Sequence, residues 1–170
     1  MDSFEAMLTR RSIRSYTDAP VEDAKVDMLL RAAMSAPSAG NQQPWRFVVV
    51  QDAEVRAALA DASQFAKMLP RAPLAIVVCA ATEGLKHPDY WMQDCAAATQ
   101  NLLIAARTLG LGAVWCGFYP NESRVQGARE ALGIADDRVV PFSVVSLGYP
   151  AEQKDRADRF REDFVRRDRW

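Results

Sequence analysis

The sequence predicts one α+β domain in which three or four strands pack under several helices. Helical and strand-like patterns are interleaved without a regular βαβ rhythm, and a chain of 170 residues suits a single domain. The run LAIVVCA at 74–80 is almost entirely apolar, as expected of a strand buried on both faces. Residues 89–109 carry the longest helical pattern, and it is apolar nearly all round, which indicates a helix packed inside the molecule.

The N-terminal part predicts two helices joined by extended chain. Asp2 or Ser3 is expected to cap a short helix over residues 3–9. The next segment, RRSIRSY, alternates its side chains and predicts extended chain. Pro20 is expected to open a second helix, because proline suits the first helical turn, and the helix should end before Pro37.

Four runs of mostly apolar residues predict the strands. They are RFVVV at 46–50, LAIVVCA at 74–80, AVWCG at 113–117 and VVPFSVVSLG at 139–148. Pro141 lies near the start of the last run. It predicts an edge position or a bulge for that strand, because proline cannot donate a ladder hydrogen bond.

Three further helical patterns separate the strands. Residues 54–69 predict one or two helices, and residues 89–109 predict one long helix that Gly110 ends. At ~1.5 Å per residue the long helix would span about 30 Å, the width of a small domain. Asn121 is expected to cap a last helix that Gly133 ends.

The composition excludes several classes of protein. Lys and Arg number 21 against 22 Asp and Glu, a net charge of -1, without the basic excess of nucleic-acid-binding proteins. The N-terminus has no signal-peptide pattern, and no apolar stretch is long and clean enough to span a bilayer. The three cysteines form no CxxC motif, which argues against a disulfide framework or a zinc site. We therefore expect a cytoplasmic protein.

Two other functional patterns are weak. His87 is the only histidine and no nucleophile motif accompanies it, which argues against Ser-His-Asp catalysis. In LGLGAVWCG the glycines follow a helix and precede a strand, the reverse of the Rossmann order. Gly110 is better explained as a helix stop.

The residues from Glu152 onward differ in character from the rest. Thirteen of these last 19 residues are charged. The only large apolar residues among them are Phe160, Phe164, Val165 and Trp170. A solvated helix or a frayed end would explain the charge. An arm laid across a second subunit would explain the aromatic residues as well.

The RRSIR segment is a candidate anion site. Arg10 and Arg11 could have a purely structural role at the carbonyl end of the first helix. Guanidinium groups also bind phosphate through a bidentate fork, and Ser12 adds a hydroxyl. Extended chain places Arg10, Ser12 and Arg14 on one side, so that they could line a ligand along its length.

The PSAGNQQPW segment is typical either of a surface turn or of a ligand-binding loop. Small residues and amides are common in turns. Three successive amides, Asn41, Gln42 and Gln43, could instead donate to and accept from a flat heterocycle. Residues 38–40 are small enough to let the backbone approach a ring closely, and Trp45 is expected to anchor the next strand in the core.

Four motifs taken together, in this order and spacing, resemble the nitroreductase family of FMN-dependent oxidoreductases: RRSIRSY, SAPSAGNQQPWRF, DCAAATQNLLIAARTLGLGAVWCGFYP and VSLGYP. The resemblance extends from about Phe4 to Pro150 and more loosely to the terminus. It implies a central, mainly antiparallel sheet flanked by helices, and a homodimer with two FMN molecules at the subunit interface. The long buried helix would lie at that interface. Residues 1–150 would form the FMN-binding domain, and residues 151–170 an arm wrapping the partner subunit.

The same resemblance implies a set of cofactor-binding residues. They are Arg10, Arg11, Ser12, Arg14, Pro37, Ser38, Ala39, Asn41, Gln43, Gln64, Cys116, Gly117 and Arg159. The first three would hold the FMN phosphate region, and Arg159, with Arg156 as the alternative, would complete it from the tail. Arg14 would lie near the pyrimidine edge of the flavin, which Gln64 would also reach.

The remaining positions would surround the flavin ring. The backbone of Cys116 and Gly117 would face flavin N5 and O4, although some nitroreductases carry Glu where Cys116 stands. Pro37, Ser38 and Ala39 would come from the other subunit and lie against the isoalloxazine, with the two amides of the set nearby.

The implied reaction is hydride transfer from NADH or NADPH through flavin N5 to a small acceptor, which could be a nitroaromatic, a quinone or an enone. Donor and acceptor would share one flavin face, which gives ping-pong kinetics, and the flavin does the chemistry without a catalytic side chain or a metal. Two alternatives stay open. One is a same-fold enzyme of reductive dehalogenation or flavin fragmentation, although the interval TEGLKHPDYW is short for the lid that such enzymes generally need. The other is a non-catalytic dimer, with or without bound flavin.

Overall fold

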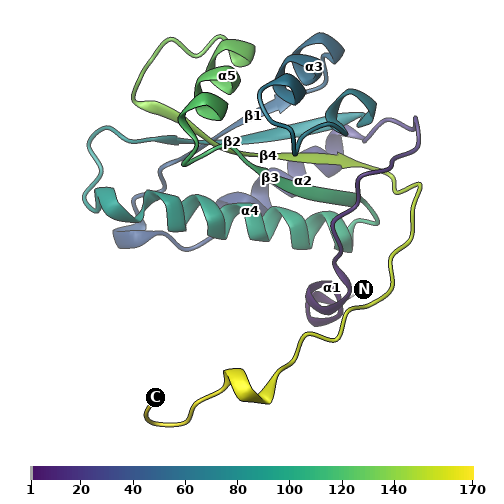
Figure 1. Cartoon of the computed structure of the whole chain (residues 1–170), viewed down its shortest axis with the longest axis vertical. Helices are drawn as coiled ribbons and strands as arrows, with labels where there is room; N and C mark the ends of the chain where they lie inside the picture. The colour runs from purple at the N-terminus through teal and green to yellow at the C-terminus, as the bar shows by residue number, and fades with distance from the viewer. Residues whose placement is uncertain (1) are drawn as a thin grey trace.

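The computed structural model describes residues 2–170 and is built on one four-stranded antiparallel sheet (Figure 1). The strands are β1 (Trp45–Val50), β2 (Leu74–Ala81), β3 (Gly112–Gly117) and β4 (Val139–Gly148). Their order across the sheet is β1-β2-β4-β3, so β1 and β3 are the edges. All four predicted strands are present, and the expected α+β fold with an antiparallel sheet flanked by helices is confirmed.

Helices cover both faces of the sheet. One face carries α2 (Asp23–Met34) and α4 (Trp91–Thr108), and the other carries α3 (Ala53–Asp61) and α5 (Glu122–Leu132) (Figure 1). Successive side chains of a strand point to opposite faces. Ile76 of β2 therefore packs in the core layer under α4, and Val77 packs in the layer under α3 and α5. All of β2 from Leu74 to Ala80 is buried, which confirms a strand buried on both faces.

The longest helix is α4, which at ~1.5 Å per residue spans about 27 Å. Its buried residues are Trp91, Asp94, Cys95, Ala98, Thr99, Leu102, Leu103 and Ala106. Gly110 follows the helix with φ of 76°, a left-handed conformation that favours glycine, and so acts as the predicted stop. Neither α4 nor any other helix within residues 2–170 combines the length and hydropathy needed to cross a bilayer.

Pro141 marks a bulge rather than an edge. β4 is an inner strand with neighbours on both sides, so the edge alternative is wrong. The register with β2 shifts between the pairs Val78–Ser143 and Cys79–Pro141. This irregularity accommodates a residue without an N–H donor inside a continuous sheet, and the bulge alternative is confirmed.

The second helix begins at Asp23 and not at Pro20. Glu22 is the N-cap and has extended backbone angles, φ -65° and ψ 141°. Val21 is 6% exposed and belongs to the core. Because extended chain carries Val21 into the core, the helix starts only after it.

The pattern over residues 54–69 forms one helix and a separate turn. α3 ends at Asp61, and the chain then makes turns before a short 3-10 segment, η2 (Leu69–Arg71). Pro70 stands inside η2, where its missing N–H has no helical partner to lose. Leu69 is fully buried, so burial of this residue explains the apolar pattern without a second α-helix.

Side-chain caps begin two of the helices as predicted. The Asp2 carboxylate accepts a hydrogen bond from the N–H of Glu5 at 2.8 Å at the start of α1 (Ser3–Thr9). Asn121 accepts one from the N–H of Arg124 at 3.0 Å at the start of α5. Gly133 ends α5 with φ of 65°.

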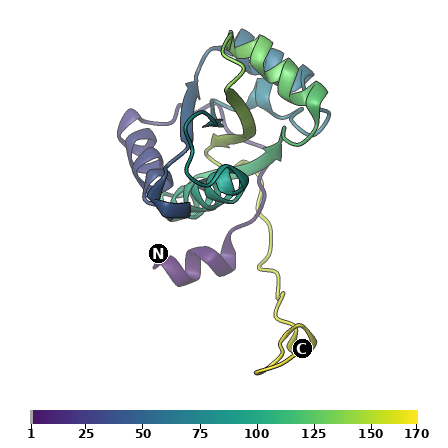
Figure 2. The same cartoon turned by 90° about the vertical axis from the view of Figure 1, so that its left-hand side faces the viewer.

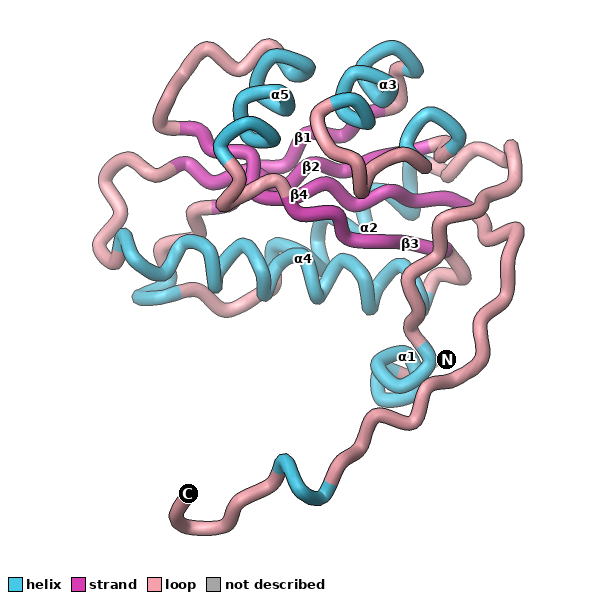
Figure 3. Tube along the Cα trace, in the orientation of Figure 1, coloured by secondary structure: helices cyan, strands magenta, loops and turns pink. Residues whose placement is uncertain are grey.

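The tail after Pro150 leaves the body of the molecule (Figures 1 and 2). It is loop except for one short 3-10 turn, η4 (Glu162–Phe164), so the tail contains no continuous helix (Figure 3). Its exposed aromatic residues are Phe160, Phe164 and Trp170. α1 also stands off the sheet and exposes Phe4.

Candidate functional site

Residues 10–16 run as extended chain beside the start of β3, as predicted. The N–H of Ile13 donates to the carbonyl of Ala113 at 3.0 Å. Gly112 leaves room for the Ile13 side chain, because a Cβ there would lie 2.6 Å from Ile13 Cγ2. With Ile13 buried, extended geometry turns the adjacent Arg14 side chain to the other side, where it is exposed.

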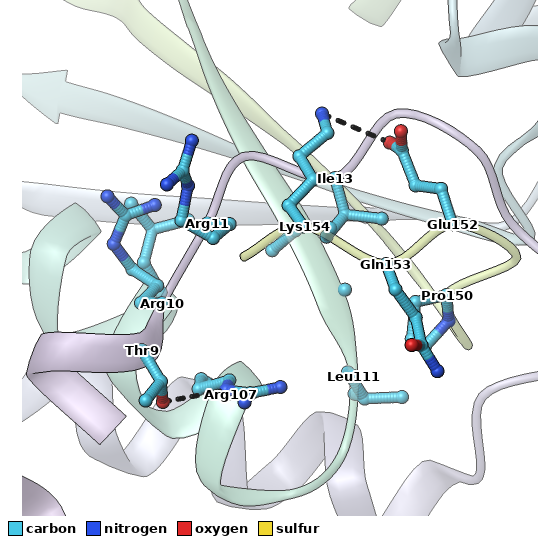
Figure 4. Close-up of a pocket in the computed structure, with 13 residues that line it drawn as sticks. Thr9, Arg10, Arg11, Ile13, Arg107, Leu111, Pro150, Glu152, Gln153 and Lys154 are labelled. Carbon is cyan, nitrogen blue, oxygen red and sulfur yellow. Dashed lines mark hydrogen bonds and ion pairs between the residues drawn. The ribbon is translucent and has the colours of Figure 1, made fainter. Parts of the chain in front are cut away.

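A cavity of about 310 Å³ opens between this segment, the end of α4 and the start of the tail (Figure 4). The cations that line it are Arg10, Arg11, Arg107 and Lys154. The carboxylate in its wall, Glu152, lies 3.4 Å from the Lys154 ammonium (Figure 4). Positive charge is therefore in excess, as an anion site requires.

Arg10 lies close to the tail residue Arg159. The pKa of the Arg10 guanidinium is lowered, first by burial and then by the positive charges of Arg159 and Arg11. The ion pairs within residues 2–170 include neither Arg10 nor Arg159. Arg156 lines the same adjoining cavity as Arg159, so the structure brings both tail candidates to Arg10. We call Arg10, Arg11, Arg156 and Arg159 the basic cluster.

A second cavity, of about 500 Å³, lies beyond Arg14 along the extended segment. The predicted residues that it brings together are Arg14, Gln64, Cys116 and Gly117. Further lining residues, which the sequence did not reveal, are Phe65, Lys67, Met68, Trp115, Tyr119 and Arg124. Their nearness to Gln64 or Cys116 in the chain hinted at most of them, whereas only tertiary packing brings in Arg124 from α5. Because three of the lining residues are aromatic, we call this the aromatic cavity.

The thiol of Cys116 is tied to the wall of the aromatic cavity. It donates a hydrogen bond to the carbonyl of Phe65 at 3.1 Å and is 4% exposed. Burial raises the pKa of this thiol, and the charge of Arg14 only partly offsets the effect. The side chain is therefore protonated at neutral pH and is no nucleophile. β3 is an edge strand, so part of its backbone hydrogen-bonding capacity is not used by the sheet.

The other predicted loop residues lie at the opposite edge of the sheet. They are Pro37, Ser38, Ala39, Asn41 and Gln43, between α2 and β1. β1 and β3 are three strand spacings apart, about 14 Å at ~4.8 Å each. The residues that line the aromatic cavity include none of this loop. Trp45, which follows the loop, is 6% exposed and anchors it in the core as predicted.

A carboxylate that the sequence did not single out holds this loop. Asp94, in the first turn of α4, is 4% exposed. It accepts hydrogen bonds from the N–H of Ala39 at 2.9 Å and from the Gln42 side chain at 2.7 Å. Gln42 also accepts from the N–H of His87 at 3.0 Å and donates to its carbonyl at 3.1 Å. The sequence signal that could have indicated Asp94 is its position as a lone acid within the apolar pattern of the long helix.

Comparisons with known proteins agree on one family. Residues 7–65 and 64–149 match the model of the nitroreductase family. A protein of Archaeoglobus fulgidus, provisionally named NADH dehydrogenase/NAD(P)H nitroreductase, is 51% identical over 99% of both chains. A provisionally named NADH oxidase of Clostridium acetobutylicum has a solved structure with a TM-score of 0.93 at 44% identity, covering 97% of this chain and 99% of that one. A Desulfovibrio desulfuricans protein, provisionally described as a nitroreductase and solved in complex with FMN, has a TM-score of 0.86 at 30% identity, covering 100% and 98%.

Proposed function

The chain belongs to the nitroreductase family, and from this premise we propose that it is an FMN-dependent enzyme that oxidises NADH or NADPH and reduces a small acceptor. The family relative named for NAD(P)H nitroreductase activity and the structural neighbour that binds FMN support this assignment. The acceptor would be a nitroaromatic, a quinone or an enone.

The observation that carries the proposal is the pairing of the basic cluster with the aromatic cavity along one extended segment. Arg10 belongs to the cluster and Arg14 lines the cavity. Four residues of extended chain separate their Cα atoms by about 13 Å. A ligand with an anionic end and a planar ring suits this arrangement, and FMN has both, so the residues present fit the cofactor.

Residues of this chain would bind and orient the cofactor at its two ends. Arg10, Arg11 and Ser12 would hold the phosphate region, with Arg159 or Arg156 from the tail. Burial and then the charges of Arg159 and Arg11 lower the Arg10 pKa, and a phosphate there would relieve the repulsion between these charges.

At the ring end, Arg14 and Gln64 would lie at the pyrimidine edge. The backbone of Cys116 and Gly117 on the edge strand would donate to the polar side of the ring. The buried, protonated Cys116 thiol would support this wall without taking part in the chemistry.

The redox chemistry itself would be supplied by bound FMN, with hydride exchange at N5 and ping-pong use of one ring face by donor and acceptor. The net reaction oxidises NAD(P)H to NAD(P)⁺ and adds two electrons and two protons to the acceptor. One proton arrives with the hydride and the other comes from solvent. The residues that line the aromatic cavity include no carboxylate or histidine, which suits a reaction without a protein acid or base.

The loop and the tail support a homodimer. None of residues 37–43 lines the aromatic cavity of its own chain, so they would cover the ring bound by a partner. In this proposal residues 1–150 form the FMN-binding domain with α4 at the dimer interface. Residues 151–170 form its arm, and the exposed Phe160 and Phe164 contact the partner.

The direct test is reconstitution of the purified protein with FMN, followed by anaerobic stopped-flow measurement of flavin absorbance. NADH and NADPH should bleach the flavin, and acceptors from a panel of nitroaromatics, quinones and enones should restore its colour. Protein that takes up no flavin contradicts the proposal and favours a flavin-free dimer, and bound flavin that neither donor bleaches favours a non-catalytic one. Halide release from the substrate, or oxygen-dependent fragmentation of the flavin, would assign another reaction on the same fold.

A further inference from the structure

The aromatic cavity carries positive charge that its own walls do not neutralise. Arg14, Lys67 and Arg124 line it, and none of its lining residues is Asp or Glu. The ion pairs within residues 2–170 include none of these three cations. The cavity is therefore suited to a ligand that carries an anionic group.

Arg124 occupies a position that is unfavourable for a cation. It is the third residue of α5, in the first turn, where the partial positive charge of the helix dipole opposes another positive charge. The ion pairs among residues 2–170 include no carboxylate that would offset this cost for Arg124. A locally unfavourable residue of this kind is more easily explained by a ligand than by folding.

Phe65 holds the Arg124 guanidinium at the cavity. The guanidinium carbon lies 4.8 Å from the centroid of the Phe65 ring, a cation–π arrangement that restrains the side chain. Stacking on a ring face leaves the N–H groups at the guanidinium edge able to donate. Phe65 itself is 55% exposed, so the pair forms an open aromatic and cationic edge.

The three cations have different roles in a loaded enzyme. Under the proposed function, Arg14 faces the pyrimidine edge of the flavin and the basic cluster takes its phosphate. Arg124 then remains for a second ligand. Its planar fork matches a carboxylate bidentately, whereas the exposed Lys67 can act only as a point charge.

We propose that Arg124, stacked on Phe65, recognises an anionic group beside the ring of a planar acceptor, so that the enzyme prefers aromatic acceptors carrying a carboxylate or sulfonate. This inference rests on the proposed function and names the acceptor class of the same site. The phosphates of the nicotinamide donor offer the same anionic chemistry, and the experiment separates the two sources.

The kinetic test compares two acceptors of nearly the same shape, the anionic 4-nitrobenzoate and the neutral 4-nitrobenzamide. The wild-type FMN-loaded enzyme should have the higher kcat/KM for the anionic compound. In Arg124→Gln the ratio of the two kcat/KM values should fall about tenfold, as expected for loss of one partly solvent-screened charge-assisted hydrogen bond. Arg31→Gln, at an exposed position of α2 on the other face of the sheet, should leave the ratio unchanged.

A binding measurement makes the test independent of turnover. Benzoate and benzamide have no nitro group to be reduced, and they are titrated calorimetrically into FMN-loaded wild type and Arg124→Gln. Benzoate should bind more tightly than benzamide to wild type, and the difference should shrink in the variant and at high salt. A variant that loses flavin would show this in its absorbance, so loss of cofactor is not mistaken for loss of anion recognition.

The donor arm measures KM for NADH and NADPH in the same variants. If Arg124→Gln raises the donor KM and leaves the acceptor ratio unchanged, the anion recognised is the donor phosphate. Equal effects on charged and neutral acceptors, together with unchanged donor KM and unchanged benzoate binding, would overturn the inference. A wild-type protein whose bound FMN is bleached by neither NADH nor NADPH contradicts the proposed function instead, and the benzoate titration still decides the role of Arg124.

Discussion

The carboxylate of Asp94 lies 2.7 Å from the side-chain nitrogen of Gln42, and this hydrogen bond ties the first turn of α4 to the loop before β1. The second oxygen of Asp94 accepts from the N–H of Ala39. The His87 ring lies against the same loop, since a Cβ on Gly40 would come within 2.8 Å of His87 Nε2. These contacts fix a loop that turn-forming residues alone would leave variable.

Asp94→Ala should loosen this loop. The N–H of the half-buried Ala39 would lose its acceptor, and we expect the free energy of unfolding to fall by about 1–3 kcal/mol. If the loop covers a partner's flavin, FMN should also dissociate faster on dialysis. Asp89→Ala, at an exposed position just before α4, is the control and should change neither quantity. Normal stability and FMN retention in Asp94→Ala would show that the loop does not depend on this carboxylate.

Arg10→Ala should weaken FMN binding. A charge-assisted hydrogen bond to a phosphate contributes about 1.5–3 kcal/mol, so the dissociation constant measured by flavin fluorescence should rise at least tenfold. Arg31→Ala removes a charge of the same sign elsewhere and should leave FMN affinity unaltered. Unchanged affinity in Arg10→Ala would refute the role given to Arg10.

The tail should be needed for assembly. The exposed aromatic residues of the arm would bury apolar surface against a partner, which stabilises a dimer by ~25 cal/mol per Å². Light scattering should give the mass of a dimer for the full chain, and a larger monomer fraction for a chain ending at residue 159. A monomer that retains FMN would contradict the interface site.

Two buried thiols should make the protein sensitive to alkali. Burial raises the pKa of Cys79 and of Cys95 to about 12, from an ordinary value near 9.0. The unfolded thiols ionise first as the pH rises, so the unfolded state binds fewer protons and stability falls above about pH 9. Each thiol contributes a slope of about 1.4 kcal/mol per pH unit in the window between the two pKa values.

Cys95→Ala removes one of these thiols. Urea unfolding at pH 8 and pH 10 should show that the variant loses about 1.4 kcal/mol less than wild type over this interval. Cys95→Ala costs some packing at both pH values, but that loss does not vary with pH. Parallel losses in the two proteins would show that ionisation of Cys95 does not limit alkaline stability.

The predictable parts of the fold are those fixed by local chemistry. The apolar run of β2, the Asn121 cap and the glycine stops each act within a few residues, and each is present as expected. The predicted start of α2 at Pro20 was wrong, because Val21 packs into the core as extended chain. This tertiary contact overrides the preference of proline for the first turn of a helix.

By itself, the sequence determined the strands and helices, the extended RRSIR segment and the residue types that suit an anion and a flat ring. Hydrophobic period, capping and side-chain chemistry are properties of neighbouring residues, so the chain displays them directly. Only the tertiary structure decided that Pro141 stands at an inner bulge, that Arg159 approaches Arg10, and that Arg124 reaches the aromatic cavity. It also decided that residues 37–43 and Cys116 lie at opposite edges of the sheet. These relations depend on strand order and on contacts between segments far apart in the sequence, and no local pattern encodes them.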